Sequence, residues 1–156
     1  MTEDARFEDG REAPLNLGAL DAEDLKVISS LAQDAVFPAS EMRWHRQGAR
    51  FALMLNRVRW EDEGKARHDA ERVQTVLMFN NVLKVASQGV NKGDKDTILS
   101  LLQIEFVETD APSGDVLLTL AGDGAIRLSV EALEATLKDV TRPYVAHSRK
   151  FPEHPA

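Results

Sequence analysis

The chain has 156 residues, of which 26 are acidic and 19 are basic, giving a formal net charge of −7, and it contains no cysteine. A chain of this length buries roughly 68–70% of its unfolded surface, so one core is sufficient and we expect a single domain. The missing cysteines exclude disulfides, iron–sulfur clusters, thiolate nucleophiles and cysteine-based zinc sites.

Compartment and partner class follow from charge and hydropathy. The first 20 residues are acidic where a secretory signal would be basic and then apolar. No apolar run approaches the roughly 20 residues that cross a bilayer. The negative net charge repels the phosphate backbone of nucleic acids. We therefore expect a cytoplasmic protein with no membrane contact, for which nucleic acid is a disfavoured partner.

Three segments can be distinguished along the chain. Residues 1–16 combine acidic side chains with glycine and proline, which predicts a disordered acidic tail. Residues 17–142 carry the regular apolar patterns and are predicted to form one α+β domain. Residues 143–156 contain three prolines and are predicted to be an irregular C-terminal tail.

Helical periodicity occurs at both ends of the predicted domain. Near the start, apolar residues recur at steps of 3, 4 and 3, with Asp21 placed to cap the helix. These apolar residues are Leu25, Ile28, Ala32 and Ala35. Near the end, Leu133, Leu137 and Val140 lie at steps of 4 and 3, which predicts a C-terminal helix that ends before Pro143.

Between the two helices the apolar period is about two, which is typical of strands. The pattern predicts about seven strands, a hairpin that turns at Gln47–Gly48 and further strands at 73–79, 82–87, 98–107, 116–120 and 126–130. Connected in chain order, they form an antiparallel meander, either a curved sheet or a half-open barrel. Seven strands followed by a helix resemble the pleckstrin-homology-like barrel, here preceded by an extra helix.

Two local features of these strands bear on function. In the second strand of the hairpin, Arg57 and Arg59 occupy the parity of the core side chains, and a bulge near Asn56 would return both to solvent. If residues 73–79 and 82–87 pair through Asn80–Asn81, both faces of that hairpin are apolar. This second feature predicts cover by a helix or a contact with another subunit.

Searches for known chemical motifs give negative results. Residues 89–97 contain glycine, lysine and threonine, but not with the spacing of a phosphate-binding loop. The four histidines (His45, His68, His147 and His154) lack the spacing of metal ligands. No nucleophile-elbow motif of the Gly-x-Ser-x-Gly type is present. We expect no metal, no cofactor and no catalytic residue.

Charge asymmetry gives the one candidate binding surface. Five arginines and no acid lie between Met42 and Trp60. Arginine forks beside a tryptophan ring suit planar anions, and the candidate ligand-binding residues are Arg43, Arg57, Arg59 and Trp60. The structural alternative is that the arginines keep an exposed strand face soluble and pair with acids of the first helix.

Several segments together resemble a known family. They are residues 25–29, 33–36, 51–57 with Trp60, 99–102, 111–114 and 122–128. They are similar to a family of small bacterial proteins known only as a domain of unknown function, and the resemblance covers about Leu15 to Val140. It implies a stand-alone cytoplasmic domain and supplies no catalytic or ligand-binding residue.

Three functions are consistent with these observations. The first is a non-enzymatic protein-interaction domain that self-associates as a dimer or larger homo-oligomer, or binds an unidentified protein. The alternative is a binding module for a small anionic ligand or an acidic segment, acting through the arginine and tryptophan hairpin. The third is an enzyme that uses paired carboxylates.

Overall fold

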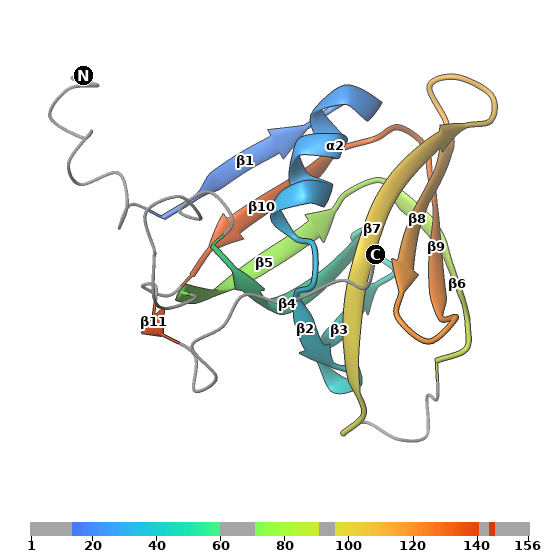
Figure 1. Ribbon diagram of the computed structural model, residues 1–156. Coiled ribbons are helices and arrows are strands. Elements are labelled where there is room, and N and C mark those ends of the chain that lie inside the picture. The colour runs from blue at the N-terminus through green and yellow to red at the C-terminus, as the bar shows by residue number, and fades with distance from the viewer. Residues whose placement is uncertain (1–13, 60–70, 91–95, 141–143, 146–156) are drawn as a thin grey trace, which may run out of the picture.

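The computed structural model describes residues 14–59, 71–90, 96–140 and 144–145, and within them one α-helix accompanies eleven strands (Figure 1). The helix is α2 (Ala22–Leu31), and a 3-10 turn, η1, spans Ala39–Glu41. The strands are β1 (Asn16–Ala19), β2 (Val36–Pro38), β3 (Met42–His45), β4 (Arg50–Val58), β5 (Glu71–Phe79), β6 (Val82–Gln88), β7 (Ile98–Glu108), β8 (Gly114–Leu120), β9 (Ala125–Val130), β10 (Ala135–Asp139) and β11 (Tyr144–Val145).

All strands belong to one antiparallel sheet that does not close. Its order is β1-β10-β5-β4-β2-β7-β8-β9-β6, with β3 also paired to β4 and β11 to β5. The predicted antiparallel sheet with an N-terminal helix is confirmed. The predictions of seven strands and of a simple meander are wrong, because β10 inserts between β1 and β5, and β6 pairs with β9. The resemblance to a pleckstrin-homology-like order fails for the same reason.

Helix α2 forms as the sequence predicts. The carboxylate of Asp21 accepts a hydrogen bond from the backbone N–H of Asp24 at 2.8 Å, which caps the helix. Leu25 and Ile28 are buried against the sheet, together with Ala32 and Ala35 in the segment that follows. The helix therefore covers the inner face of the sheet with its apolar stripe.

The first hairpin is confirmed, but the predicted bulge in its second strand is wrong. Trp44 of β3 pairs with Phe51 of β4, and the turn lies at residues 46–49. The register of β4 with β5 runs from Phe51 through to Val58 without a shift. Arg57 therefore keeps the parity of the core side chains and is completely buried.

The predicted hairpin of β5 with β6 is also wrong. Asn81 does adopt a positive φ of 61°, so the chain turns where the sequence indicates. After the turn, however, β6 joins β9 at the other end of the sheet, while β5 lies between β4 and β10. The two apolar faces of a β5–β6 hairpin do not exist, and this argument for a subunit contact no longer applies.

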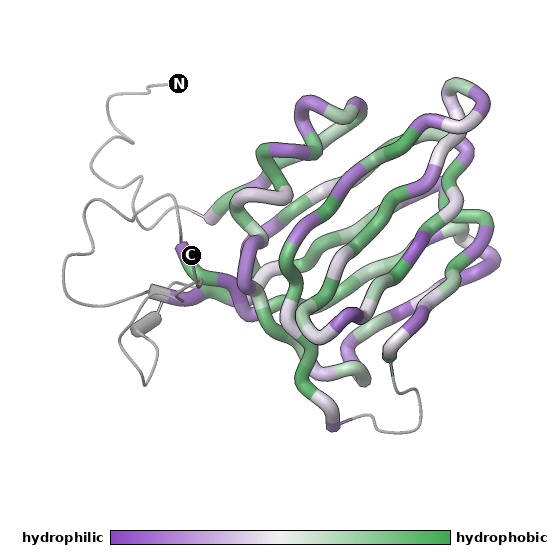
Figure 2. Tube along the Cα trace, turned by 45° about the vertical axis from the view of Figure 1, so that its right-hand side comes forward, coloured by the Kyte–Doolittle hydropathy of each residue, from purple (hydrophilic) through white to green (hydrophobic). Residues whose placement is uncertain are grey.

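Strands β7 to β9 follow the predicted alternation except at one shift in register. Alternate residues of β8 and β9, from Val116 to Val130, are buried, and Figure 2 shows hydrophobic and hydrophilic residues alternating along the strands. The ladder of β7 with β8 shifts between Leu101 and Gln103, and Leu101 and Ile104 are buried. Ile98 has the same parity as Ile104 in the strand predicted at 98–107, but it is 61% exposed because it lies before this shift.

The predicted C-terminal helix is wrong, because residues 135–139 form β10. Alternate side chains, Leu133, Ala135 and Leu137, are buried in the core, and they fit a period of two as well as a helical step. In the segment expected to be irregular, Tyr144–Val145 forms β11. The predicted disordered tail 1–16 is wrong at its end, where Asn16 begins β1. Residues 1–13, 143 and 146–156 of the two predicted tails lie outside the described residues. None of the described helices is long and apolar enough to span a membrane.

Candidate functional site

Of the candidate ligand-binding residues that the structure describes, Arg43 lies apart from Arg57 and is exposed, whereas Arg57 and Arg59 are buried. Arg43 is exposed on β3, where its Nη1 donates to the backbone oxygen of Ser40. Arg43 pairs with Ala52, so it lies on the face of the sheet opposite to Arg57. Arg59 is buried at 3% exposure, and Trp60 lies outside the described residues. The predicted exposed arginine surface is therefore not formed by Arg57 and Arg59.

Arg57 instead belongs to a buried polar cluster with Thr75 and Asp139. Its Nη2 donates to both carboxylate oxygens of Asp139, at 3.0 and 3.1 Å, and its Nε donates to Oδ1 at 3.2 Å. The hydroxyl of Thr75 accepts from Nε at 3.1 Å and donates to Oδ1 of Asp139 at 2.7 Å. The guanidinium is thus held by a carboxylate in a region with almost no water.

The carboxylate of Asp139 also binds the backbone of Leu15, the residue that precedes β1. Oδ2 of Asp139 accepts from the backbone N–H of Leu15 at 2.9 Å, and the Asp139 N–H donates to the Leu15 oxygen at 2.9 Å. The cluster therefore joins the residue before β1 to β4, β5 and β10. The hydrogen bonds of the Arg57–Thr75–Asp139 cluster hold these segments together, which gives the cluster a structural role.

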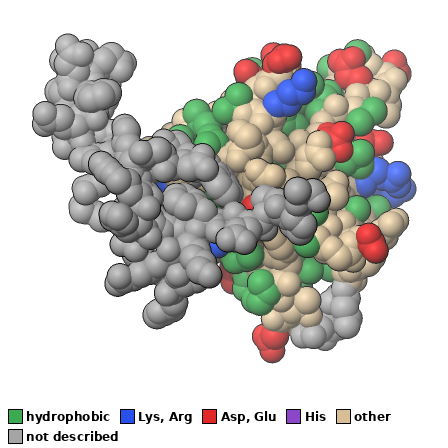
Figure 3. All heavy atoms as spheres, viewed as in Figure 1, with side chains coloured by type: hydrophobic (Ala, Val, Ile, Leu, Met, Phe, Trp, Pro, Cys, Tyr) green, Lys and Arg blue, Asp and Glu red, His purple; other side chains and the backbone are tan. Residues whose placement is uncertain are grey.

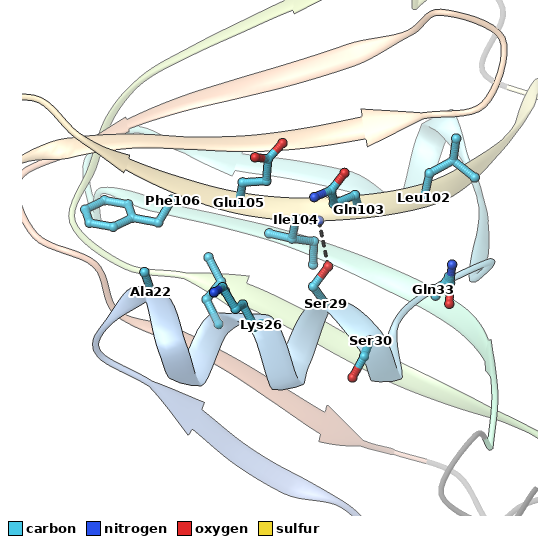
Figure 4. Close-up of a pocket in the computed structure, with 11 residues that line it drawn as sticks. Ala22, Lys26, Ser29, Ser30, Gln33, Leu102, Gln103, Ile104, Glu105 and Phe106 are labelled. Atoms are coloured by element: carbon cyan, nitrogen blue, oxygen red, sulfur yellow. Dashed lines mark hydrogen bonds between the residues drawn. The ribbon is translucent and has the colours of Figure 1, made fainter.

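A groove of about 420 Å³ lies between α2 and β7. From the helix, Leu25, Lys26 and Ser29 line it, and from the strand Leu102, Ile104 and Phe106 do so (Figure 4). The hydroxyl of Ser29 accepts a hydrogen bond from the backbone N–H of Ile104 at 2.9 Å. This bond crosses the groove and connects its two walls.

Beyond Leu101, the part of β7 that forms a wall of the groove is paired with another strand on one side only, among the described residues. Strand β2 pairs with Ile98–Ser100, and Leu101 then exchanges backbone hydrogen bonds with Asp34 and Ala35, both at 2.8 Å. Among the described residues, no strand pairs with this side of β7 beyond Leu101. On its other side, β7 is paired with β8 as far as Glu108. The unpaired side of residues 103–108 is called the β7 edge below.

The alternation of antiparallel pairing identifies the backbone groups at the β7 edge. Thr109 donates its N–H to Ser113 in the turn that joins β7 to β8, whereas the Ile104 N–H points to Ser29 on the opposite side. Alternate residues of a strand point to the same side. Phe106 and Glu108 therefore direct their N–H and C=O groups away from β8, toward the groove.

The other two edges of the sheet are less open to pairing. Strand β1 has only four residues. Strand β6 has a register shift between Val82 and Lys84 and carries a lysine there. Short strands, bulges and lysine are the features by which proteins protect strand edges. The β7 edge, residues 103–108, is longer than β1 and carries no lysine, and the register shift of β7 against β8 lies just before it, between Leu101 and Gln103.

The groove offers hydrogen bonding and apolar contact. The hydroxyl of Ser29, which lines it, is already bonded to Ile104. Within the described ranges, no three His, Asp or Glu side chains are grouped to hold a metal ion. Sequence reasoning did not identify this groove, and the one available signal was the unusual length of the strand predicted at 98–107.

The fold and groove define a mainly antiparallel β-domain with one helix laid beside an incompletely paired strand. The chain belongs to the family described as "Protein of unknown function (DUF2948)", whose model matches residues 15–154. The resemblance seen in the sequence is thereby confirmed. No curated protein matches the chain, and no solved structure matches it.

Proposed function

We propose that this domain is a non-enzymatic protein-interaction module that binds an extended segment of another protein along the β7 edge. One observation carries the proposal: half of a long strand has an unpaired side that borders a groove. Addition of a strand to such an edge is a common mode of peptide recognition, in which main-chain hydrogen bonds supply affinity and side-chain pockets supply specificity.

The bound segment would pair with Phe106 and Glu108. These residues offer two N–H donors and two C=O acceptors on the groove side. The bond between Ser29 and Ile104 marks the end of the paired stretch, because the Ile104 N–H is already occupied there. Alternate side chains of the segment would then contact Leu25 and Phe106, which line the open part of the groove.

Main-chain pairing alone is too weak for stable binding. Four hydrogen bonds contribute roughly 2–6 kcal/mol at about 0.5–1.5 kcal/mol each. Association costs roughly 4–15 kcal/mol in lost freedom of motion. Each buried aliphatic side chain adds about 1.5–3 kcal/mol. We therefore expect dissociation constants in the micromolar range or weaker, set by the side chains that enter the groove.

The test uses two variants of Glu108, whose side chain is exposed. Glu108→Pro removes the N–H at the β7 edge, whereas Glu108→Ala keeps it, and neither change removes a bond to β8. Random nonapeptides are selected on the wild-type protein and then measured on both variants. We expect equal binding to the wild type and Glu108→Ala, and at least about tenfold weaker binding to Glu108→Pro.

Two results would contradict the proposal. One is a failure to enrich any peptide above a control without the protein. The other is unchanged binding to Glu108→Pro, shown by its amide spectrum to be folded. Light scattering, which measures the molar mass in solution, shows whether a second copy of this chain supplies the segment. In that case the wild type has the mass of two chains and Glu108→Pro the mass of one, in agreement with the self-association expected from the sequence.

A further inference from the structure

We infer that the segment bound at the β7 edge is basic, an inference that rests on the proposed function. Acidic side chains lie over the start of α2 and the loop after β7 (Figure 3). All are exposed, and they are Asp21, Glu23, Asp24, Glu105, Glu108 and Asp110. Lys26 is the one basic residue among those that line the groove.

Part of this acidity has a local explanation. Asp21 caps α2, and Glu23 and Asp24 lie in its first turn, where the helix dipole favours negative charge. Glu105 and Glu108 have no such explanation, because they lie in a strand. Their partners across the ladder with β8 are Leu117 and Gly114, neither of which is basic. Their side chains point to opposite faces of the sheet, one on each side of the β7 edge.

On each face of the sheet, a basic side chain of a bound strand would meet one of these carboxylates at close range. Cross-strand neighbours have their Cβ atoms about 4.5–5.5 Å apart, well inside the Debye length of about 8 Å at physiological salt. Each exposed ion pair contributes about 0.2–1 kcal/mol, which is a factor of about 1.4 to 5 in affinity. Glutamate at the same positions of the segment would be repelled by a comparable factor.

The test compares two peptides with one core. Each has the core Thr-Val-Thr-Val-Thr, flanked at both ends by lysine in one peptide and by glutamate in the other. Binding to the full chain is followed by NMR from the amide signals of Phe106 and Glu108. We expect the lysine peptide to bind at least about threefold more tightly at 20 mM salt, with the difference falling below about twofold at 0.5 M salt.

Charge variants of the protein identify the carboxylates responsible. The double variant Glu105→Gln/Glu108→Gln is expected to weaken the lysine peptide about three- to tenfold and not the glutamate peptide. Glu41→Gln is the matched control, since Glu41 lies beside Ile98 at the opposite end of β7, and it should change neither affinity.

The outcomes separate this inference from the proposed function. If both peptides shift the two amide signals with equal affinity, the β7 edge binds extended segments and the inference of a basic segment is wrong. The same holds if the double variant binds the lysine peptide as the wild type does. If neither peptide shifts these signals at either salt concentration, the proposed function and the inference both fail.

Discussion

Replacement of Asp139 by alanine tests the buried polar cluster most directly. The change removes the acceptor of two Arg57 donors, of the Thr75 hydroxyl and of the Leu15 N–H, at distances of 2.7 to 3.2 Å. It leaves the Arg57 charge buried without its carboxylate. Breaking a buried pair in this way costs about 3–5 kcal/mol, a large share of a total stability of roughly 5–15 kcal/mol.

Urea unfolding followed by circular dichroism measures this loss. With a slope of about 1–3 kcal/mol per molar urea, we expect the midpoint of Asp139→Ala to fall by about 2 M. The exposed neighbour on the same strand supplies the control, and Lys138→Ala should change stability by less than about 0.5 kcal/mol.

The double variant Arg57→Met/Asp139→Leu distinguishes the loss of the whole ion pair from the loss of one partner. Exchange of both charges for apolar side chains removes the desolvation cost together with the attraction, so we expect a stability within about 1 kcal/mol of the wild type or above it. The reasoning is refuted if Asp139→Ala costs less than about 1 kcal/mol. It is also refuted if the double variant is as unstable as Asp139→Ala.

Two further predictions concern the walls of the groove. A Cβ at residue 114 would lie 2.6 Å from Phe106 Cε1 and 2.6 Å from the Val107 oxygen, so Gly114→Ala should cost about 1–3 kcal/mol and shift the NMR signals of the Phe106 ring; an unchanged ring spectrum would contradict this. Ser29→Ala removes the acceptor of the Ile104 N–H, and we expect faster hydrogen exchange at that amide and a loss of about 1–2 kcal/mol. Unchanged exchange at Ile104 would show that the hydroxyl is not its partner in solution.

The elements that the sequence predicted correctly are those whose cause is local. Asp21, which caps α2, lies three residues before Asp24, whose N–H donates the capping hydrogen bond. The β3–β4 hairpin turns over four residues, and β8 and β9 alternate along their own length. In each case the deciding contacts lie within one element or across one turn, so the period of the side chains is enough to reveal them.

The two main errors share one physical cause. The charge of Arg57 led to the predicted bulge in β4, which the structure does not contain, and the charge of Asp139 hid the period of two in β10. Each is the partner of the other, and they lie 82 residues apart in the sequence. A buried charge looks like a surface residue until its counter-charge is known. The β7 edge was missed for a related reason, since an unpaired side follows from which strands lie beside β7.

The position of β10 has a consequence for the order in which the chain can fold during synthesis. Strand β1 pairs only with β10, and β10 also forms the outer neighbour of β5. Until residues 135–139 leave the ribosome, β1 has no strand to pair with and one side of β5 is unpaired. A nascent chain that has not yet reached β10 therefore exposes unpaired strand edges, and β1 can dock only once residues 135–139 are available.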